Sequence, residues 1–166
     1  MLTKEQLIKK LELEKHPEGG FFKETYRSKI SISGSSLPLE FDSDRNVSTC
    51  IYFMLASDEF SAFHKVNQDE AWHFYLGDSI LLHMISPEGE YSKTKIGNDF
   101  TADETPQFIV PAHHWFAAEI IQPESFALVG CTVSPGFDFE DFELAERDQL
   151  QKNFPEHQEL ISKLTR

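Results

Sequence analysis

Short runs of apolar and β-branched residues, separated by turn formers, recur along most of the chain. The runs fall at 21–28, 48–55, 60–66, 70–76, 80–85, 91–96, 107–110, 114–121 and 125–133. Glycine, proline, asparagine and aspartate between them are typical of tight turns, and no helical period interrupts the series. This pattern predicts an all-β protein, an antiparallel sandwich or jelly roll.

Helices are predicted only at the two ends of the chain. Thr3 and Gln6 have the spacing of a capping box at the start of a short helix. The C-terminal tail predicts two further helices, at 143–152 and 156–164. Residues 29–46 are polar and broken by glycine and proline, which predicts a long loop of the kind that forms lids or interfaces.

Length, charge and cysteine content narrow the classes of function. The 166 residues, 1–166, are expected to form one domain with a formal net charge of −13, which disfavours nucleic acid and anionic membranes as partners. No apolar run is long enough to span a bilayer, and the charged N-terminal segment is not a secretory signal. Cys50 and Cys131 lie in strand-like runs and are expected to be free core thiols of a cytoplasmic protein.

Residues 60–77 form the segment with the clearest candidate chemistry. It is interpreted as strand, turn and strand, with His64 on the first strand, Glu70 opening the second and Gly77 ending it. If His64 and Glu70 face the interior, one imidazole and one carboxylate share an apolar pocket. Such a pocket suits acid–base catalysis or ligand binding, and a buried pair with only a structural role is the alternative.

The His64, Glu70 and Gly77 spacing resembles the first motif of the cupin superfamily, whose members bind metal in a small β-barrel. The resemblance implies four metal ligands, of which two are missing here. Val66 stands where the second histidine belongs, and Phe116 stands where the histidine of the second motif belongs. Two protein ligands make a poor transition-metal site, so no metal and no other cofactor is expected.

Longer blocks carry a closer resemblance. Five stretches, in order along nearly the whole chain, are similar to the cupin_5 family, also called DUF985: 16–28, 61–64, 70–78, 110–118 and 130–142. The resemblance implies a double-stranded β-helix, or jelly roll, with a short N-terminal helix and C-terminal helices. It also implies a homodimer and a likeness to RmlC-like sugar-nucleotide epimerases. His113 departs from the family pattern, where a turn glycine is expected.

Two classes of function remain open. The first is a metal-independent epimerase or isomerase that binds a small polar metabolite, such as a sugar derivative, in the barrel. The second is a non-catalytic small-molecule binding or sensing protein, and a metal-dependent cupin enzyme is a further alternative. His64 and Glu70 are the predicted catalytic residues. The predicted ligand-binding residues are Glu24, Tyr26, Ser61, Trp72, Phe74, Gln107 and Phe116.

Several other aromatic and histidine side chains have structural interpretations. His16 is expected to be a loop residue, and strand parity places His73 on the outer face of its strand. Phe137, Phe139 and Phe142 are expected to anchor the C-terminal tail to the sheet.

Overall fold

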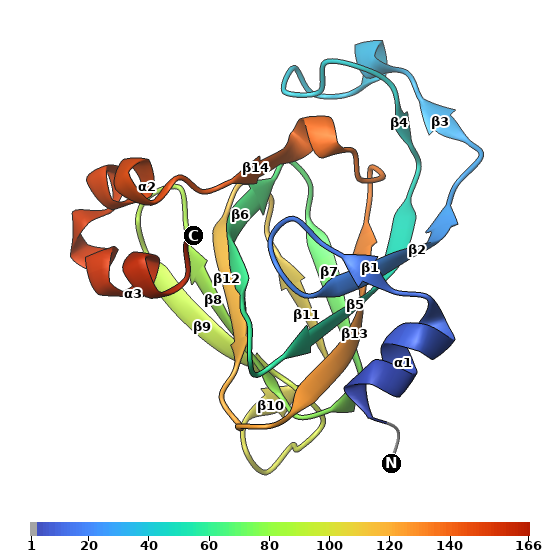
Figure 1. Cartoon of the computed structure of the whole chain (residues 1–166). Coiled ribbons are helices and arrows are strands. Elements are labelled where there is room, and N and C mark those ends of the chain that lie inside the picture. Colours follow the sequence, from blue (N-terminus) through green and yellow to red (C-terminus); the bar gives the residue numbers. More distant parts are fainter. Residues whose placement is uncertain (1–2) are drawn as a thin grey trace.

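The computed structural model describes residues 3–166 and contains two six-stranded sheets that enclose an apolar core (Figure 1). The first sheet has the strand order β1-β2-β5-β13-β7-β11, and every neighbouring pair in it is antiparallel. Its strands are β1 (Glu14–Lys15), β2 (Phe21–Arg27), β5 (Thr49–Ala56), β13 (Phe126–Val133), β7 (Glu70–Gly77) and β11 (Gln107–Val110).

The second sheet has the order β10-β9-β8-β12-β6-β14, with only the β9–β10 pair parallel. Its strands are β10 (Glu104–Thr105), β9 (Tyr91–Ile96), β8 (Ile80–Ile85), β12 (Trp115–Ile120), β6 (Ser61–Val66) and β14 (Phe142–Leu144). The two sheets together form the predicted jelly roll.

The 60–77 segment is a strand, a turn and a strand, as predicted, but its two strands do not pair with each other as a hairpin. Strand β6 pairs with β12 and β14 in the second sheet, whereas β7 pairs with β13 and β11 in the first. The turn between β6 and β7 therefore crosses from one sheet to the other. As a result, His64 and Glu70 belong to opposite sheets.

The N-terminal helix α1 (Lys4–Leu11) covers the outer face of the first sheet (Figure 1). The predicted capping box is present: Gln6 N–H donates to Thr3 Oγ1, and Thr3 N–H donates to Gln6 Oε1. Leu7 is buried against Met54 and Leu128 of the sheet. Burial of an apolar side chain of this size contributes about 2 kcal/mol to folding, so the helix is held chiefly by packing.

The C-terminal tail covers the outer face of the second sheet with α2 (Arg147–Asn153) and α3 (Gln158–Lys163) (Figure 1). Leu150 and Ile161 are buried there against Trp115, while the neighbouring Phe116 faces the core between the sheets. The predicted helix at 143–152 begins too early. Residues 142–144 instead pair with β6 as strand β14, because this pairing covers the edge of the second sheet.

The predicted 29–46 loop contains short regular elements: β3 (Ser31–Ile32), the 3-10 turn Gly34–Ser36 and β4 (Arg45–Asn46). Strands β3 and β4 pair with each other in a two-stranded ribbon beside the main sheets (Figure 1). At the turn before β12, His113 has a φ of 64°, the left-handed conformation that favours glycine. Within residues 3–166, none of the helices is long and apolar enough to cross a bilayer.

Candidate functional site

A cavity of about 150 Å³ opens between the two sheets at the end of the molecule near the β1–β2 turn. Its walls combine ionisable groups with a continuous set of aromatic and aliphatic side chains. The polar or ionisable lining residues are His16, Glu18, Glu24, Arg27, Thr49, His64, Glu70, Cys131 and Asp138. The apolar lining residues are Phe22, Ile51, Phe53, Val66, Trp72, Val133, Phe137, Phe139 and Phe142.

The tight turn between β1 and β2 delivers two of these groups, His16 and Glu18. His16 N–H donates to the Gly20 carbonyl at 3.1 Å, and Gly19 N–H donates to the His16 carbonyl at 3.0 Å. Gly19 and Gly20 have φ values of 113° and 74°, which side chains with a Cβ rarely adopt. Ala62 N–H of β6 donates to the Glu18 carbonyl at 2.8 Å, so the turn is fixed to the strand that carries His64.

Glu18 is the centre of a buried hydrogen-bond network. Its Oε2 lies 3.0 Å from His64 Nε2 and 3.3 Å from His16 Nδ1. Its Oε1 accepts a 2.8 Å hydrogen bond from Ser61 Oγ. The side chains of Glu18 and His64 are only 7% and 3% exposed, so this is an acid–base network withdrawn from water.

The geometry places one proton on the His64–Glu18 contact. His64 Nδ1 lies 2.7 Å from the Ala62 carbonyl oxygen, which can only accept, so Nδ1 is protonated. Burial lowers the pKa of His64 and Glu18 opposes that shift. For Glu18, burial acts to raise the pKa, but His64, His16 and Ser61 together hold it below its usual value. Because an unprotonated Nε2 would face the carboxylate as a second acceptor, we infer that His64 Nε2 and Glu18 Oε2 share one proton between them.

The opposite wall carries Glu70 at the start of β7. Burial raises the pKa of Glu70 to about 7, and the charge of Glu18 acts in the same direction. The Cys131 thiol and the Trp72 indole lie close enough to Glu70 to oppose this shift. Burial and Glu70 in turn raise the pKa of Cys131 well above its usual value, so the thiol stays protonated. Glu70 therefore changes protonation state near neutral pH, as a general acid or base requires.

A bulge in β2 decides which of its residues reach the cavity. Glu24 pairs with Ile51 and Tyr26 with Cys50, with a register shift between the two pairs. Because the shift reverses the side-chain alternation, Arg27 follows Glu24 into the lining, and Tyr26 is 52% exposed outside it. Arg27 and Glu24 form an ion pair of 2.7 Å at the cavity.

The other predicted ligand-binding residues divide by their position. Trp72 lines the cavity, while Ser61 lies behind Glu18 and contacts it directly. Phe116 packs behind the His64 ring, with 4.0 Å between ring centroids. Phe74 packs against the core away from the cavity lining, and Gln107 is exposed beside His73 on edge strand β11. These positions place Tyr26, Phe74 and Gln107 outside the cavity.

His64 and Glu70 both line the cavity, but they do not form the direct pair considered from the sequence. No hydrogen bond joins them in the described part of the chain, and the partner of His64 is Glu18. His16 lies in a loop as expected, but its side chain is only 8% exposed and lines the cavity, a role that the sequence analysis did not assign to it. For His16 and Glu18 the sequence offered one signal, the pair of glycines at 19–20 that follows them directly before strand β2.

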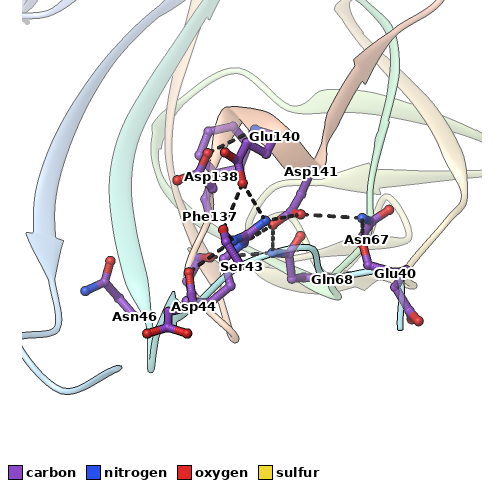
Figure 2. Close-up of polar contacts among 12 residues, drawn as sticks. Glu40, Ser43, Asp44, Asn46, Asn67, Gln68, Phe137, Asp138, Glu140 and Asp141 are labelled. Carbon is purple, nitrogen blue, oxygen red and sulfur yellow. Dashed lines mark hydrogen bonds and ion pairs between the residues drawn. The ribbon is translucent and has the colours of Figure 1, made fainter. Parts of the chain in front are cut away.

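The segment 137–142 closes one side of the cavity and is held by a buried ion pair beneath it. Arg45 Nε lies 2.7 Å from Asp141 Oδ2, and both side chains are 2% exposed. Gln68 donates to the same Asp141 oxygen at 2.6 Å, and Figure 2 shows Gln68 and Asn67 pointing toward Asp141. Phe137, Phe139 and Phe142 thus line the cavity, in addition to contacting one another as the predicted aromatic cluster.

The residues at the cavity do not fit a bound transition metal. Within residues 3–166, no group of three or more His, Cys, Asp or Glu is arranged to hold an ion. Val66 presents an apolar side chain to the cavity, and Phe116 packs against the His64 ring at an interplanar angle of 59°. His64 Nδ1 lies 2.7 Å from the Ala62 carbonyl oxygen and Nε2 lies 3.0 Å from Glu18 Oε2, so a metal ion could bind this imidazole only by displacing one of these contacts.

Solved structures of other proteins share this fold. A protein from Shewanella oneidensis has a crystal structure that superposes with a TM-score of 0.90 and 42% identity, covering 100% of this chain and 99% of that one. A hypothetical protein from Leishmania major superposes with a TM-score of 0.89 and 30% identity, covering 99% of each chain. Oxalate decarboxylase from Bacillus subtilis shares only the fold, with a TM-score of 0.54 and 14% identity over 36% of its chain.

The jelly roll and its enclosed cavity define a cupin. The family model described as Cupin superfamily (DUF985) matches residues 5–145, and the chain belongs to that family. An uncharacterized protein from Saccharomyces cerevisiae, YML079W, is 35% identical over 147 residues, which are 82% of this chain and 72% of the yeast protein.

Proposed function

We propose that the cavity binds a small polar molecule and transfers a proton to and from it without a metal, as an isomerase or epimerase does. The observation that carries this proposal is the pair of acid–base groups on opposite walls: the His16–Glu18–His64 network and Glu70. A histidine–carboxylate network placed across one apolar cavity from a carboxyl group with a pKa of about 7 suits removal of a proton from one position and its return at another.

The geometry favours His16 as the base. His16 Nδ1 lies 3.3 Å from Glu18 Oε2, and no hydrogen bond engages its Nε2 within residues 3–166. Nδ1 also accepts a 3.4 Å hydrogen bond from the Glu18 backbone N–H, so Glu18 holds that side of the ring and Nε2 is the nitrogen left to exchange a proton with a bound molecule. His64 has both nitrogens occupied, so we assign it the role of holding Glu18 in place. Glu70 then supplies or receives the second proton.

Deuterium uptake tests this function. Wild-type protein is incubated in deuterated water with keto-sugar nucleotides and with small ring carbonyl compounds, and incorporation at carbon is followed by mass spectrometry. Removal of the base in His16→Ala should reduce exchange by about 10²-fold or more. His157→Ala, which removes a histidine from the C-terminal tail, should leave exchange unchanged. Equal exchange in wild type and His16→Ala would contradict the assignment.

A non-catalytic binding protein is the second candidate. It is favoured by the internal pairing of the polar network, because Glu18 accepts a hydrogen bond from Ser61, lies within 3.3 Å of a nitrogen of both His16 and His64, and needs no ligand to complete these contacts. Binding of a compound to the cavity without any proton exchange would support this candidate and argue against the enzyme.

The homodimer and the cytoplasmic location are also proposals. Tyr75 and Ile109 expose 50% and 47% of their surface on the first sheet, on neighbouring strands β7 and β11, where a second copy could bury them. Both cysteines are free, as a reducing compartment requires. Sedimentation at micromolar concentration tests the dimer, and a single monomer species would contradict it.

A further inference from the structure

One polar group on the cavity wall has no partner. The Trp72 side chain is 1% exposed, and its Nε1–H is among the buried polar atoms of residues 3–166 that make no hydrogen bond; the Glu70 carboxyl lies close enough for the indole to lower its pKa, but outside hydrogen-bonding geometry. The ring itself is fixed, because it packs edge-on against Phe53 and Phe116 with centroid distances of 5.8 and 6.4 Å. A buried donor left without an acceptor is costly, so a partner from outside the chain would stabilise it.

The rest of the cavity wall consists mainly of aromatic side chains. Five phenylalanines line the cavity, and the His16 ring stacks on one of them, Phe139, at an interplanar angle of 25°. Faces of this kind bind flat rings through offset or edge-on contacts. A volume of about 150 Å³ is that of a known engineered cavity that holds benzene, which indicates room for one small ring.

A sugar fits this wall poorly. Each hydroxyl group that enters the cavity loses its bonds to water and needs a replacement. Glu18 already accepts from Ser61 and contacts the His64 and His16 nitrogens at 3.0 and 3.3 Å, and Arg27 is engaged by Glu24. Few interior groups therefore remain to satisfy the many hydroxyls of a sugar. An ionised ligand is disfavoured as well, because the interior is apolar and already holds the Glu18 carboxylate.

We infer that the cavity takes a small, flat, uncharged heteroaromatic ring that carries a hydrogen-bond acceptor at its edge, and that this acceptor binds Trp72 Nε1–H. A ring carbonyl of the pyridone type has this chemistry. The acceptor would lie beside Glu70, whose protonated carboxyl can donate to the same atom. This ligand class rests on the proposed function only because both concern the same cavity.

The two tryptophans of the chain make the test direct. Trp115 lies outside the cavity under the C-terminal helices, so Trp115→Phe leaves Trp72 as the only tryptophan and its fluorescence as the reporter. This variant is titrated with three probes: 2-pyridone, toluene and D-glucose. We expect 2-pyridone to change Trp72 fluorescence saturably and to bind about tenfold more tightly than toluene, because toluene leaves the donor unpartnered. D-glucose should give no saturable change over the same range.

A second variant isolates the hydrogen bond from the packing. Trp72→Phe keeps an aromatic ring but removes the pyrrole half of the indole with its N–H group, so toluene measures the change in packing and 2-pyridone the loss of the hydrogen bond; binding is followed by ligand-observed NMR. Affinity for 2-pyridone should fall about tenfold, while affinity for toluene should stay within about twofold. Retained toluene binding shows that the cavity is still folded. Trp115→Phe is the matched control and should bind both probes as the wild type does.

The outcomes separate this inference from the proposed function. Saturable binding of D-glucose with no binding of 2-pyridone would overturn the ligand class. Equal affinity for 2-pyridone and toluene would overturn the role of Trp72. Binding of 2-pyridone without proton exchange on any ring carbonyl would support the inference and count against the enzyme.

Discussion

Glu18 Oε2 lies 3.0 Å from His64 Nε2, although the two residues are 46 positions apart, with Glu18 in the β1–β2 turn and His64 on β6. This contact joins the β1–β2 turn to the second sheet. It also makes Glu18, rather than Glu70, the carboxylate that orients the histidine predicted from the sequence. The first prediction concerns this contact.

Glu18→Gln should destabilise the protein by about 1–3 kcal/mol, because the neutral amide is a weaker acceptor and presents donors to the groups that now donate to Glu18. Urea unfolding at pH 7 measures the difference. The matched control is Glu143→Gln in the more exposed Lys65–Glu143 ion pair, which should change stability by about 0.5 kcal/mol or less. Equal effects of the two substitutions would show that the Glu18 network contributes no special stability.

Glu70 should make stability fall as the pH rises. Its pKa is about 7 in the folded chain against an ordinary value of 4.5, so the folded state binds more protons between these values. The stabilisation is complete below pH 4.5 and is lost as the pH rises through 7. The difference of about 2.5 pKa units corresponds to about 3 kcal/mol.

Comparison with Glu70→Gln isolates this effect. The lowered pKa of Glu18 acts in the opposite sense, with stability present above 4.5 and lost as the pH falls, but it is common to both proteins. The stability of wild type minus that of Glu70→Gln, from urea unfolding at pH 5, 6, 7 and 8, should decrease steadily. A difference independent of pH would mean that Glu70 is ionised throughout this range.

Arg45→Met should cost about 3–5 kcal/mol, because it leaves the Asp141 carboxylate buried without its partner. The double variant Arg45→Met/Asp141→Leu should recover much of this loss, since neither charge then remains buried. Thermal or urea unfolding measures both. If the double variant loses more unfolding free energy than Arg45→Met and Asp141→Leu lose when added together, the ion pair is not an isolated unit. Gln68 and Asn67, which also contact Asp141, must then be included in it.

Protein purified without a histidine tag should hold no stoichiometric transition metal. His64 and Glu70 alone occupy the positions of cupin ligands, and both nitrogens of His64 are engaged. Elemental analysis is the measurement. About one zinc, iron, nickel or manganese ion per chain, lost in Glu70→Ala, would contradict the donor-set argument and favour a metal-dependent enzyme.

The sequence alone determined the fold class and most of the strands. Alternating runs and turn residues located β8, β9 and β11 at Ile80–Ile85, Tyr91–Ile96 and Gln107–Val110, as the structure has them. The capping box at Thr3 and the positions of His64 and Trp72 on the cavity wall also followed from local spacing. These features depend on short-range periodicity, which a single sequence contains.

Only the tertiary structure decided which groups meet in the cavity. The side-chain alternation of a strand survives only until a bulge, and the bulge in β2 replaced Tyr26 with Arg27 at the cavity. His16 and Glu18 lie in a turn with no periodicity, and the partners of Glu18 on β6, Ser61 and His64, lie more than 40 positions away. Their roles arise from the closure of two sheets around one cavity, a long-range pairing that no local pattern specifies.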